Sequence, residues 1–596
     1  MDRGEQRRPK YRFGAAIPLA IGIVSLLGAQ RGAWAVLGID INVDTIDNVA
    51  FVNDSVNATP LYSTTLFSPT FGSVGFGIPF NNNYGQGSVV AVIDLGLIDN
   101  TNPALTKVAN YFNIALPSSP QATPPANLVG DHGTAVAKFA AGYNATTSDN
   151  VVAATDFGIA PLATVWSGSI ILSGDPNSEA NIQTNPSVIY PFVQTMNVGV
   201  NGTKADVINA SFGATGVPAS DDWFSQALDG LAKQNSHTTI VIAAGNNEVQ
   251  PTQVSSPAAS FNNIAVAALG ADPSLTYQNV AWFSNRGPND FYNPNTNLTI
   301  PNVRATVDIA APGDEFIVQA IPTPGQPGYY SIEYGSGTSY AAPLVSGAIA
   351  QLTAYAHGLT ADVGFLQFFD AKAPQRVADA FDSRVIKAVL LNSAHKTAGW
   401  DNGQTLVSGV ITTTQGLDYN VGAGALDVAA AANNYLNGTF DPQVVGTQFV
   451  GPMGWDLSTV TAGSPNVYLM GTIPSGVWIT ATLDWFADTS FDYTSLNPSA
   501  DRFANLTLEI LEQISPTEWK EIAVSEALYN NVQHLYFQAP DTANYAVEVL
   551  YAGVQYAPVG DTTNSQTYAL AWAPEPGTLA LAAPALLLIS LRRRRR

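Results

Sequence analysis

The sequence predicts an α/β fold, built on a doubly wound and mostly parallel sheet, followed by an all-β sandwich. Two apolar, β-branched runs, 87–94 (GSVVAVID) and 239–247 (TIVIAAGNN), are typical of strands buried on both faces, as in parallel sheets. A glycine-rich turn at 335–347 (GSGTSYAAPLVSG) leads into a predicted long helix of small apolar residues. From about residue 437 apolar and polar residues alternate, which is typical of antiparallel strands.

The composition is that of a folded, loop-rich globular protein. The length of 596 residues predicts several domains. The chain has no cysteine, which excludes disulfides, thiolate metal sites and a cysteine nucleophile. The net charge of −22 argues against nucleic-acid partners, which are polyanions, and is compatible with bound calcium.

The N-terminus predicts export. Residues 1–35 have the three parts of a signal peptide, which signal peptidase would remove: basic residues within 7–12, an apolar run at 13–29, and Ala-Trp-Ala at 33–35. An uncleaved N-terminal anchor is the alternative. Residues 36–85 are polar and rich in Asn, Ser and Thr, which predicts an extended N-terminal arm.

The C-terminus forms a second tripartite signal at 574–596. Pro-Glu-Pro is followed by an apolar run at 577–591 and by five arginines. This run is shorter than the roughly 20 residues that span a bilayer comfortably, and the arginines would stay on the cytoplasmic side. The segment resembles the PEP-CTERM sorting signals of Gram-negative bacteria, which implies removal by an exosortase. A plain membrane tail is the alternative. Either way we expect an exported protein, in the cell envelope, on the surface or secreted, that meets the membrane only through its terminal signals.

Four side chains of the α/β part are candidates for chemistry. Asp94 ends the first buried strand, at the carboxyl edge where doubly wound folds place their sites. His132 lies in the helix-opening stretch DHGTAVA. Ser339 lies at the mouth of the long helix, where the helix dipole and backbone N–H groups favour a developing oxyanion. Asn246 closes the second strand and offers an uncharged amide donor. Taken singly, an Asp after a strand or a Gly-Asn pair is equally explained by a turn.

Three helices are predicted around these residues. The first begins at Asp131 and ends near Gly142, and the long one runs to about Tyr355. Pro343 is expected in the first turn of the long helix, where its missing N–H has no cost. After an insertion at about 357–383, a further helix is expected from residue 384 to residue 394.

These motifs, in this order, resemble those of the subtilisin-like serine proteases, the subtilases. Further matches are GIAP at 158–161, DVINASFG at 206–213, AWFSNRGP at 281–288 and DIAAPG at 308–313. The resemblance covers about residues 86–436 and implies a subtilisin-like peptidase domain.

The resemblance also implies a role for each candidate. The implied site residues are the catalytic Asp94, His132 and Ser339, the oxyanion donor Asn246, and the substrate contacts Ser211, Phe212 and Gly213. The last three would follow from a strand edge that binds extended peptide through main-chain hydrogen bonds. The implied reaction is peptide-bond hydrolysis without a cofactor. Structural calcium is common in the family, but no ligand set is legible in this sequence.

The chain also departs from the family pattern. Leu95 stands where Thr or Ser usually follows the aspartate, Asp131 stands where Gly is usual, and the arm at 36–85 is short for a folded pro-domain. The alternative is therefore a catalytically inactive binding or structural protein on a protease scaffold. Because all four chemical positions are filled, we expect a secreted or cell-surface serine endopeptidase that acts on proteins or peptides.

Residues 437–573 predict the β-sandwich. The segments 477–485, 506–510 and 545–549 alternate apolar with mostly polar residues, which predicts one wet face per sheet. The region is similar to small β-sandwich domains appended to many secreted proteases. We expect it to act as a spacer that holds the enzyme away from the envelope, with substrate or glycan binding as the alternative.

Overall fold

The structure of the protein is a computed structural model. The residues that it describes are 84–114, 120–144, 157–176, 186–213, 221–247, 253–270, 277–314, 316–322, 330–361, 378–438, 440–442 and 449–574. The predicted signal peptide, almost all of the predicted arm, and the predicted sorting signal beyond Pro574 lie outside the described residues.

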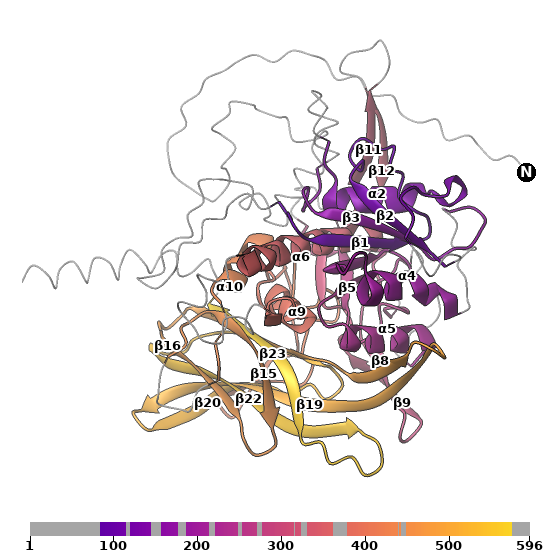
Figure 1. The fold of residues 1–596 in the computed structure, drawn as a ribbon. Coiled ribbons are helices and arrows are strands. Elements are labelled where there is room, and N and C mark those ends of the chain that lie inside the picture. Colours follow the sequence, from indigo (N-terminus) through magenta and orange to yellow (C-terminus); the bar gives the residue numbers. More distant parts are fainter. Residues whose placement is uncertain are drawn as a thin grey trace, which may run out of the picture.

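An eight-stranded sheet forms the centre of the first part of the molecule (Figure 1). In chain order its strands are β1 (Val89–Asp94), β2 (Val108–Asn113), β3 (Thr164–Ser169), β4 (Val207–Ala210), β5 (Thr239–Ala243), β6 (Ile264–Gly270), β7 (Asn279–Val280) and β10 (Ile309–Pro312). In space the order is β2-β3-β1-β4-β5-β6-β10, with all neighbours parallel, and β7 pairs antiparallel with β6. The strands β1, β4 and β5 are buried along their whole length, which agrees with the continuous apolar runs.

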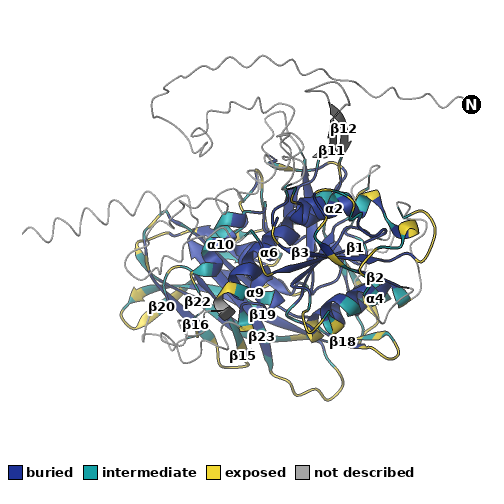
Figure 2. Ribbon diagram, turned by 45° about the horizontal axis from the view of Figure 1, so that its top comes forward, coloured by how far each residue is buried: buried dark blue, intermediate teal, exposed yellow. Residues whose placement is uncertain are grey.

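Helices cover both faces of this sheet, with α2 on one side of β1 and α4 and α5 on the other (Figure 1). The helices are α2 (Asp131–Ala141), α4 (Tyr190–Val193), α5 (Trp223–Gln234), α6 (Thr338–Ala361), α9 (Ser383–Asn392) and α10 (Val428–Leu436), with short helical turns η3 (Ala126–Leu128), η5 (Pro186–Ile189) and η6 (Gln194–Val198). Buried residues, dark blue in Figure 2, are concentrated where the helices pack on the sheet. The doubly wound, mostly parallel α/β prediction is therefore confirmed for this part.

The predicted helices are confirmed, with two corrections on α6. The helix α2 ends at Ala141, and its C-cap Gly142 donates to the Lys138 carbonyl. The helix α6 continues past Tyr355 to Ala361. The prediction that Pro343 lies in the first turn is wrong, because α6 already begins at Thr338 and Pro343 lies inside the helix.

Two hairpins extend from the α/β part. They consist of β8 (Asn289–Asn293) with β9 (Leu298–Arg304), and β11 (Phe316–Pro322) with β12 (Tyr330–Gly335). The hairpin β11–β12 projects away from the body of the molecule in Figure 1 and leads directly into α6.

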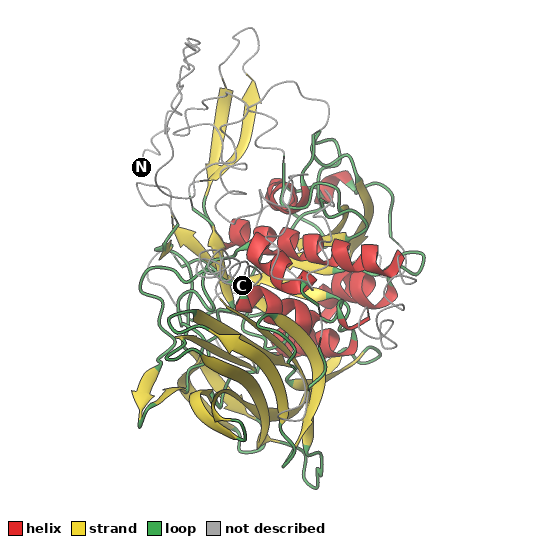
Figure 3. Cartoon of the chain, turned by 90° about the vertical axis from the view of Figure 1, so that its left-hand side faces the viewer, coloured by secondary structure: helices red, strands yellow, loops and turns green. Residues whose placement is uncertain are grey.

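The C-terminal region is rich in strands (Figure 3). Its strands are β13 (Thr405–Val407), β14 (Val410–Thr413), β15 (Gly454–Thr461), β16 (Asn466–Ile473), β17 (Trp478–Trp485), β18 (Asp488–Asp492), β19 (Asn497–Ser515), β20 (Glu518–Ser525), β21 (Val532–Gln538), β22 (Ala543–Tyr556) and β23 (Ser565–Pro574). They form a seven-stranded sheet of order β13-β14-β20-β19-β22-β16, in which β18 pairs with β19, and a four-stranded sheet of order β15-β23-β17-β21. One hydrophobic cluster includes residues of both sheets. The strands β13 and β14 show that this sheet system begins before residue 437.

The expectation of one wet face per sheet is wrong for the four-stranded sheet. The strand β17 is buried along nearly its whole length because α9 packs on the face opposite the apolar cluster. The polar half of its alternation contacts α9: the Thr480 hydroxyl donates to Asn392 Oδ1 (3.1 Å), and Asp484 lies 3.9 Å from Lys387 Nζ. The polar residues therefore form an interface between the two parts of the molecule.

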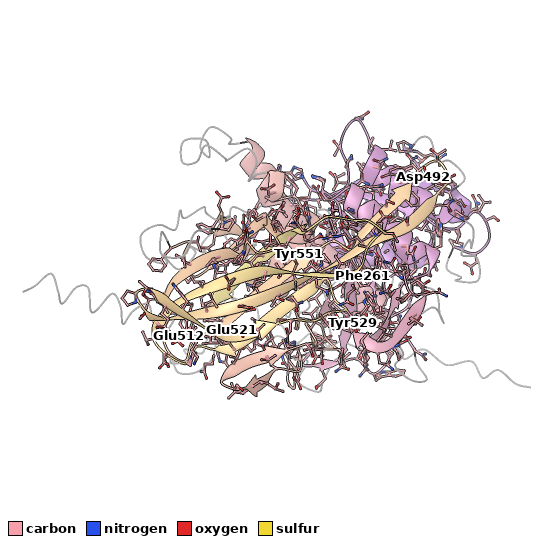
Figure 4. The ribbon with its side chains drawn as sticks, turned by 90° about the horizontal axis from the view of Figure 1, so that it is seen from below. Phe261, Asp492, Glu512, Glu521, Tyr529 and Tyr551 are labelled. Carbon is pink, nitrogen blue, oxygen red and sulfur yellow. The ribbon has the colours of Figure 1, made fainter. Side chains whose placement is uncertain are left out.

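Aromatic side chains also join the two parts. Phe261 from the α/β part lies 4.9 Å from Phe503 of β19, and Phe291 of β8 lies 5.1 Å from Tyr529, measured between ring centroids. Figure 4 shows Phe261 and Tyr529 close together on the underside of the molecule. The guanidinium of Arg304 stacks 3.6 Å above the Phe261 ring centroid. The Phe261–Phe503 and Phe291–Tyr529 contacts fix the strand-rich region against the α/β part.

Within the described part of the chain, no helix is long and apolar enough to cross a membrane. The predicted apolar run at 577–591 lies outside it.

Candidate active site

The carboxyl ends of the parallel strands meet at one edge of the sheet. Asp94 is the last residue of β1, and Asn246 follows the end of β5. The first turns of α2 and α6 bring His132 and Ser339 to the same place. Two backbone hydrogen bonds, Leu97 N–H to Leu128 O (2.6 Å) and Gly130 N–H to Leu97 O, tie the exit of β1 to the start of α2.

Asp94 and His132 form a hydrogen-bonded pair. His132 Nδ1 lies 2.9 Å from Asp94 Oδ1; the carboxyl group is fully buried, and the imidazole side chain is 29% exposed. An ionised carboxylate only accepts hydrogen bonds, so the pair assigns the proton to Nδ1 and leaves Nε2 as the basic nitrogen. The arrangement therefore fixes both the tautomer and the direction of the ring.

The backbone around Asp94 explains how the pair fits. Leu95 N–H also donates to Asp94 Oδ1 (2.8 Å), whereas Oδ2 is buried and accepts no hydrogen bond from the described residues. A Cβ on Gly133 would lie 3.1 Å from Asp94 Cβ and 2.8 Å from the Gly96 carbonyl, so glycine at 133 allows α2 to approach the aspartate. The departure at Leu95 thus leaves the bond to His132 in place.

Ser339 lies in the first turn of α6 and exchanges hydrogen bonds with Ser211. Its hydroxyl donates to the Ser211 carbonyl (3.2 Å), and the Ser211 hydroxyl donates to the Ser339 carbonyl (2.9 Å). Pro343 explains the second bond: it has no N–H to offer the carbonyl four residues earlier, so Ser339 O is left to accept from Ser211. Rotation of the Ser339 hydroxyl about χ1 would redirect its proton.

Asn246 is oriented by Thr338. Its Oδ1 accepts from both the N–H and the hydroxyl of Thr338, each at 2.9 Å. The Thr338 hydroxyl in turn accepts from Gly245 N–H (3.1 Å). A Cβ built on Gly337 would lie 3.3 Å from Asn246 Nδ2 and 3.6 Å from Ser339 N. The side-chain nitrogen of Asn246 and the backbone nitrogen of Ser339 therefore both lie next to Gly337, at the start of α6.

The three predicted substrate contacts lie beyond the end of β4. The strand itself is paired on both sides, by β1 and by β5, so the predicted exposed edge is not on β4. Ser211 is buried and holds the Ser339 segment. Phe212 is buried against the rings of Phe192 and Phe224, and Gly213 is partly exposed.

The other histidines lie in different environments. His237 and His357 place their Nε2 atoms 3.1 and 3.0 Å from one oxygen of the buried Asp206. His534 is completely buried, and Thr482 Oγ1 lies 2.8 Å from its Nδ1. His395 is exposed. Among the predicted site residues, the structure therefore brings Asp94 and His132 together at one edge of the sheet with Ser339 and Asn246.

Two neighbouring residues were not singled out from the sequence. Thr338 orients Asn246, and Tyr340 places its ring 6.0 Å from the His132 ring, between centroids. Their position on either side of Ser339 was the available signal. In the described residues no three acidic or histidine side chains group as metal ligands do, and structural calcium stays a prediction.

Comparison with known proteins agrees with this geometry. Residues 85–434 match the model of the subtilase family. The chain is also similar to a protein named extracellular protease from Xanthomonas campestris pv. campestris, with 25% identity over 342 residues. That alignment covers 53% of this chain, and the chain spans about half (52%) of the relative's length. Since the family model covers more than half of the sequence, including Asp94, His132, Asn246 and Ser339, the chain belongs to the subtilase family.

Proposed function

We propose that the protein is an active serine endopeptidase that hydrolyses peptide bonds through Asp94, His132 and Ser339. The observation that carries the proposal is the 2.9 Å contact between Asp94 Oδ1 and His132 Nδ1, at the sheet edge where the nucleophile helix begins. Family membership gives the reaction class, and this contact gives the histidine the tautomer that a general base requires.

In the first half of the reaction, Ser339 Oγ attacks the peptide carbonyl carbon and His132 Nε2 takes its proton. Asp94 stabilises the resulting imidazolium. The carbonyl oxygen becomes an oxyanion that accepts from Asn246 Nδ2 and Ser339 N–H. When the C–N bond breaks, the leaving amine takes the proton from His132, and the acyl group remains on Ser339.

In the second half, water attacks the acyl carbon and gives a proton to His132. The bond between the acyl carbon and Ser339 Oγ then breaks, and the proton returns to the serine. The Ser211 carbonyl accepts the Ser339 hydroxyl in the resting arrangement, so this hydroxyl must turn toward His132 before attack. These steps require no cofactor.

The alternative is an inactive binding protein on a protease scaffold, which the departures at Leu95 and Asp131 motivate. We favour activity because Leu95 still donates its N–H to the Asp94 carboxylate. The side-chain amide of Asn246 is also held by two hydrogen bonds in an orientation useful for catalysis.

A fluorophosphonate probe tests the proposal, since it reacts with serines that a neighbouring base activates. We expect labelling of the full chain at Ser339, and loss of both labelling and peptide hydrolysis in Ser339→Ala. Ser88→Ala removes a buried serine hydroxyl next to the start of β1, at the end opposite Asp94, and should leave labelling intact. Peptide hydrolysis that persists in purified Ser339→Ala would contradict the assignment.

We further propose that the protein is exported and processed at both ends, by signal peptidase and by an exosortase, in the envelope of a Gram-negative bacterium. The terminal sequence patterns support this, as does the name of the Xanthomonas relative. For the C-terminal region we propose a two-sheet sandwich that supports the peptidase and spaces it from the envelope. Its polar contacts with α9 favour support over ligand binding.

A further inference from the structure

One aromatic ring joins the helix of His132 to the helix of Ser339. The Tyr340 ring centroid lies 6.0 Å from that of His132 and 5.5 Å from that of Phe139. His132 and Phe139 are both on α2, seven residues apart, so they share one face about 10 Å apart along the axis. The Tyr340 ring therefore packs between His132 and Phe139 and forms the contact between α2 and α6 at the level of the site.

Gly335 packs directly against the Tyr340 ring. A Cβ at residue 335 would lie 2.7 Å from Tyr340 Cε2 and 2.9 Å from both its Cζ and its hydroxyl oxygen. Real Cβ atoms do not come so close, because such a contact lies inside the van der Waals distance. The backbone of Tyr340 is held as well, since its N–H donates to the Gly337 carbonyl (3.0 Å). The ring is thus fixed by α2 on one side and by the end of β12 on another.

Asp94 alone does not fix the distance between base and nucleophile. Its hydrogen bond holds His132 at the single atom Nδ1, and one hydrogen bond tolerates a range of angles. We propose that Tyr340 is a positioning residue that sets the distance and angle between His132 Nε2 and Ser339 Oγ. The inference rests on the proposed peptidase function. Proton transfer needs a separation of roughly 2.6–3.2 Å, so a shift of about 1 Å is expected to cost about a hundredfold in rate.

Four variants of the full chain separate positioning from folding. Tyr340→Phe keeps the ring, and Tyr340→Leu removes it. Gly335→Ala pushes the ring without altering Tyr340. Gly358→Ala makes the same chemical change on α6 at a position where the added carbon meets no atom within 4 Å. For each variant we would measure kcat and KM for a short peptide, the rate of fluorophosphonate labelling at Ser339, and the thermal midpoint.

We expect Tyr340→Phe and Gly358→Ala to stay within about twofold of the parent chain. In Tyr340→Leu and Gly335→Ala, kcat and the labelling rate should fall by about 10- to 100-fold, with KM nearly unchanged. If Tyr340→Leu shows no unfolding transition, this variant is not folded, and the comparison of Gly335→Ala with Tyr340→Phe tests the inference instead.

Parental labelling rates in both ring-displacing variants would overturn the inference, and so would a loss seen in KM alone. An equal loss in Tyr340→Phe would assign the effect to the hydroxyl and overturn it too. These results are distinct from failure of the proposed function, which would appear as an unlabelled Ser339 in the parent chain.

Discussion

At the scale of single residues, the site depends on groups that do not themselves react. The Asn246 side chain is held in one orientation because Thr338 donates twice to its Oδ1. The Ser339 carbonyl is available to Ser211 because Pro343 provides no N–H. The first effect depends on the donors that Thr338 supplies, and the second on the donor that Pro343 lacks; both residues lie in the first two turns of α6.

The Thr338 hydroxyl gives a prediction at this scale. Thr338→Val keeps the shape of the buried side chain and the N–H bond to Asn246, but removes the hydroxyl donor to Asn246 and the acceptor of Gly245 N–H. We expect kcat to fall about tenfold with KM unchanged, because the proposed oxyanion donor Asn246 is oriented less well. A tenfold fall corresponds to about 1.4 kcal/mol. Steady-state kinetics on a short peptide measure both parameters.

Thr353→Val is the matched control for this prediction. It removes a buried hydroxyl from the same helix, bonded to Ser88 and the Ile349 carbonyl, far along α6 from Ser339. It should cost stability but not kcat. Equal kcat losses in the two variants would refute a specific role for Thr338.

At the scale of elements, Lys387 of α9 lies near two buried carboxyl groups, Asp484 of β17 and Asp308 just before β10. Lys387 Nζ lies 2.9 Å from Asp308 Oδ1 and 3.9 Å from Asp484 Oδ1. Burial raises the pKa of Asp484 to about 8, because water no longer stabilises the charged carboxylate. The positive charge of Lys387 lowers this pKa by a smaller amount. Asp484 therefore keeps its proton at neutral pH, and Lys387 pairs with Asp308.

This predicts a pH-dependent effect of Asp484→Asn. Between the unfolded pKa near 4 and the folded pKa near 8, the folded parent binds a proton that the unfolded chain does not. The stability of the parent should therefore fall as pH rises through this window, whereas the asparagine variant has no such proton to bind. The thermal midpoint of Asp484→Asn minus that of the parent should grow from pH 4 to pH 8.

Asp541→Asn, which removes an exposed carboxylate of the same region, is the control. Midpoint curves of Asp484→Asn and the parent that run parallel across this range would show that Asp484 is ionised in the folded protein.

The elements also show what could be predicted from the sequence. Strands β1 and β5 were predictable because a strand buried on both faces needs an unbroken apolar run. The starts of α2 and α6 were predictable because the turns before them have distinctive residues. The burial of the polar face of β17 could not be predicted. Its alternation of Thr and Asp with apolar residues looks the same whether the polar side meets water or the polar residues of α9. The roles of Thr338 and Tyr340 depend on contacts with residues distant in sequence, which no local pattern contains.

At the scale of the whole molecule, the α/β part and the strand-rich region share one hydrophobic cluster. Phe491, Val532 and Ala571 of the C-terminal region pack in the same cluster as Ile386 and Leu390 of α9. Separating the two parts would expose these apolar surfaces to water, at roughly 25 cal/mol for each Å² uncovered. The two parts are therefore expected to unfold together.

Deletion of residues 440–573 tests this coupling. We expect the truncated chain to lose turnover of even a short peptide and to aggregate, because α5 and α9 lose the strands that cover them. A chain that ends at Pro574 is the control and should stay soluble and active. Full peptide turnover with a sharp unfolding transition in the truncated chain would show that the peptidase part is independently stable.

The position of β23 has a consequence for biogenesis. This last described strand lies in the middle of its sheet, between β15 and β17, and contacts α9. A polypeptide that stopped before residue 565 would leave a gap there, with unsatisfied backbone amides on both sides. Folding of this sheet must therefore wait until nearly all of the chain has been synthesised, and prematurely terminated products would offer quality-control proteases an open structure.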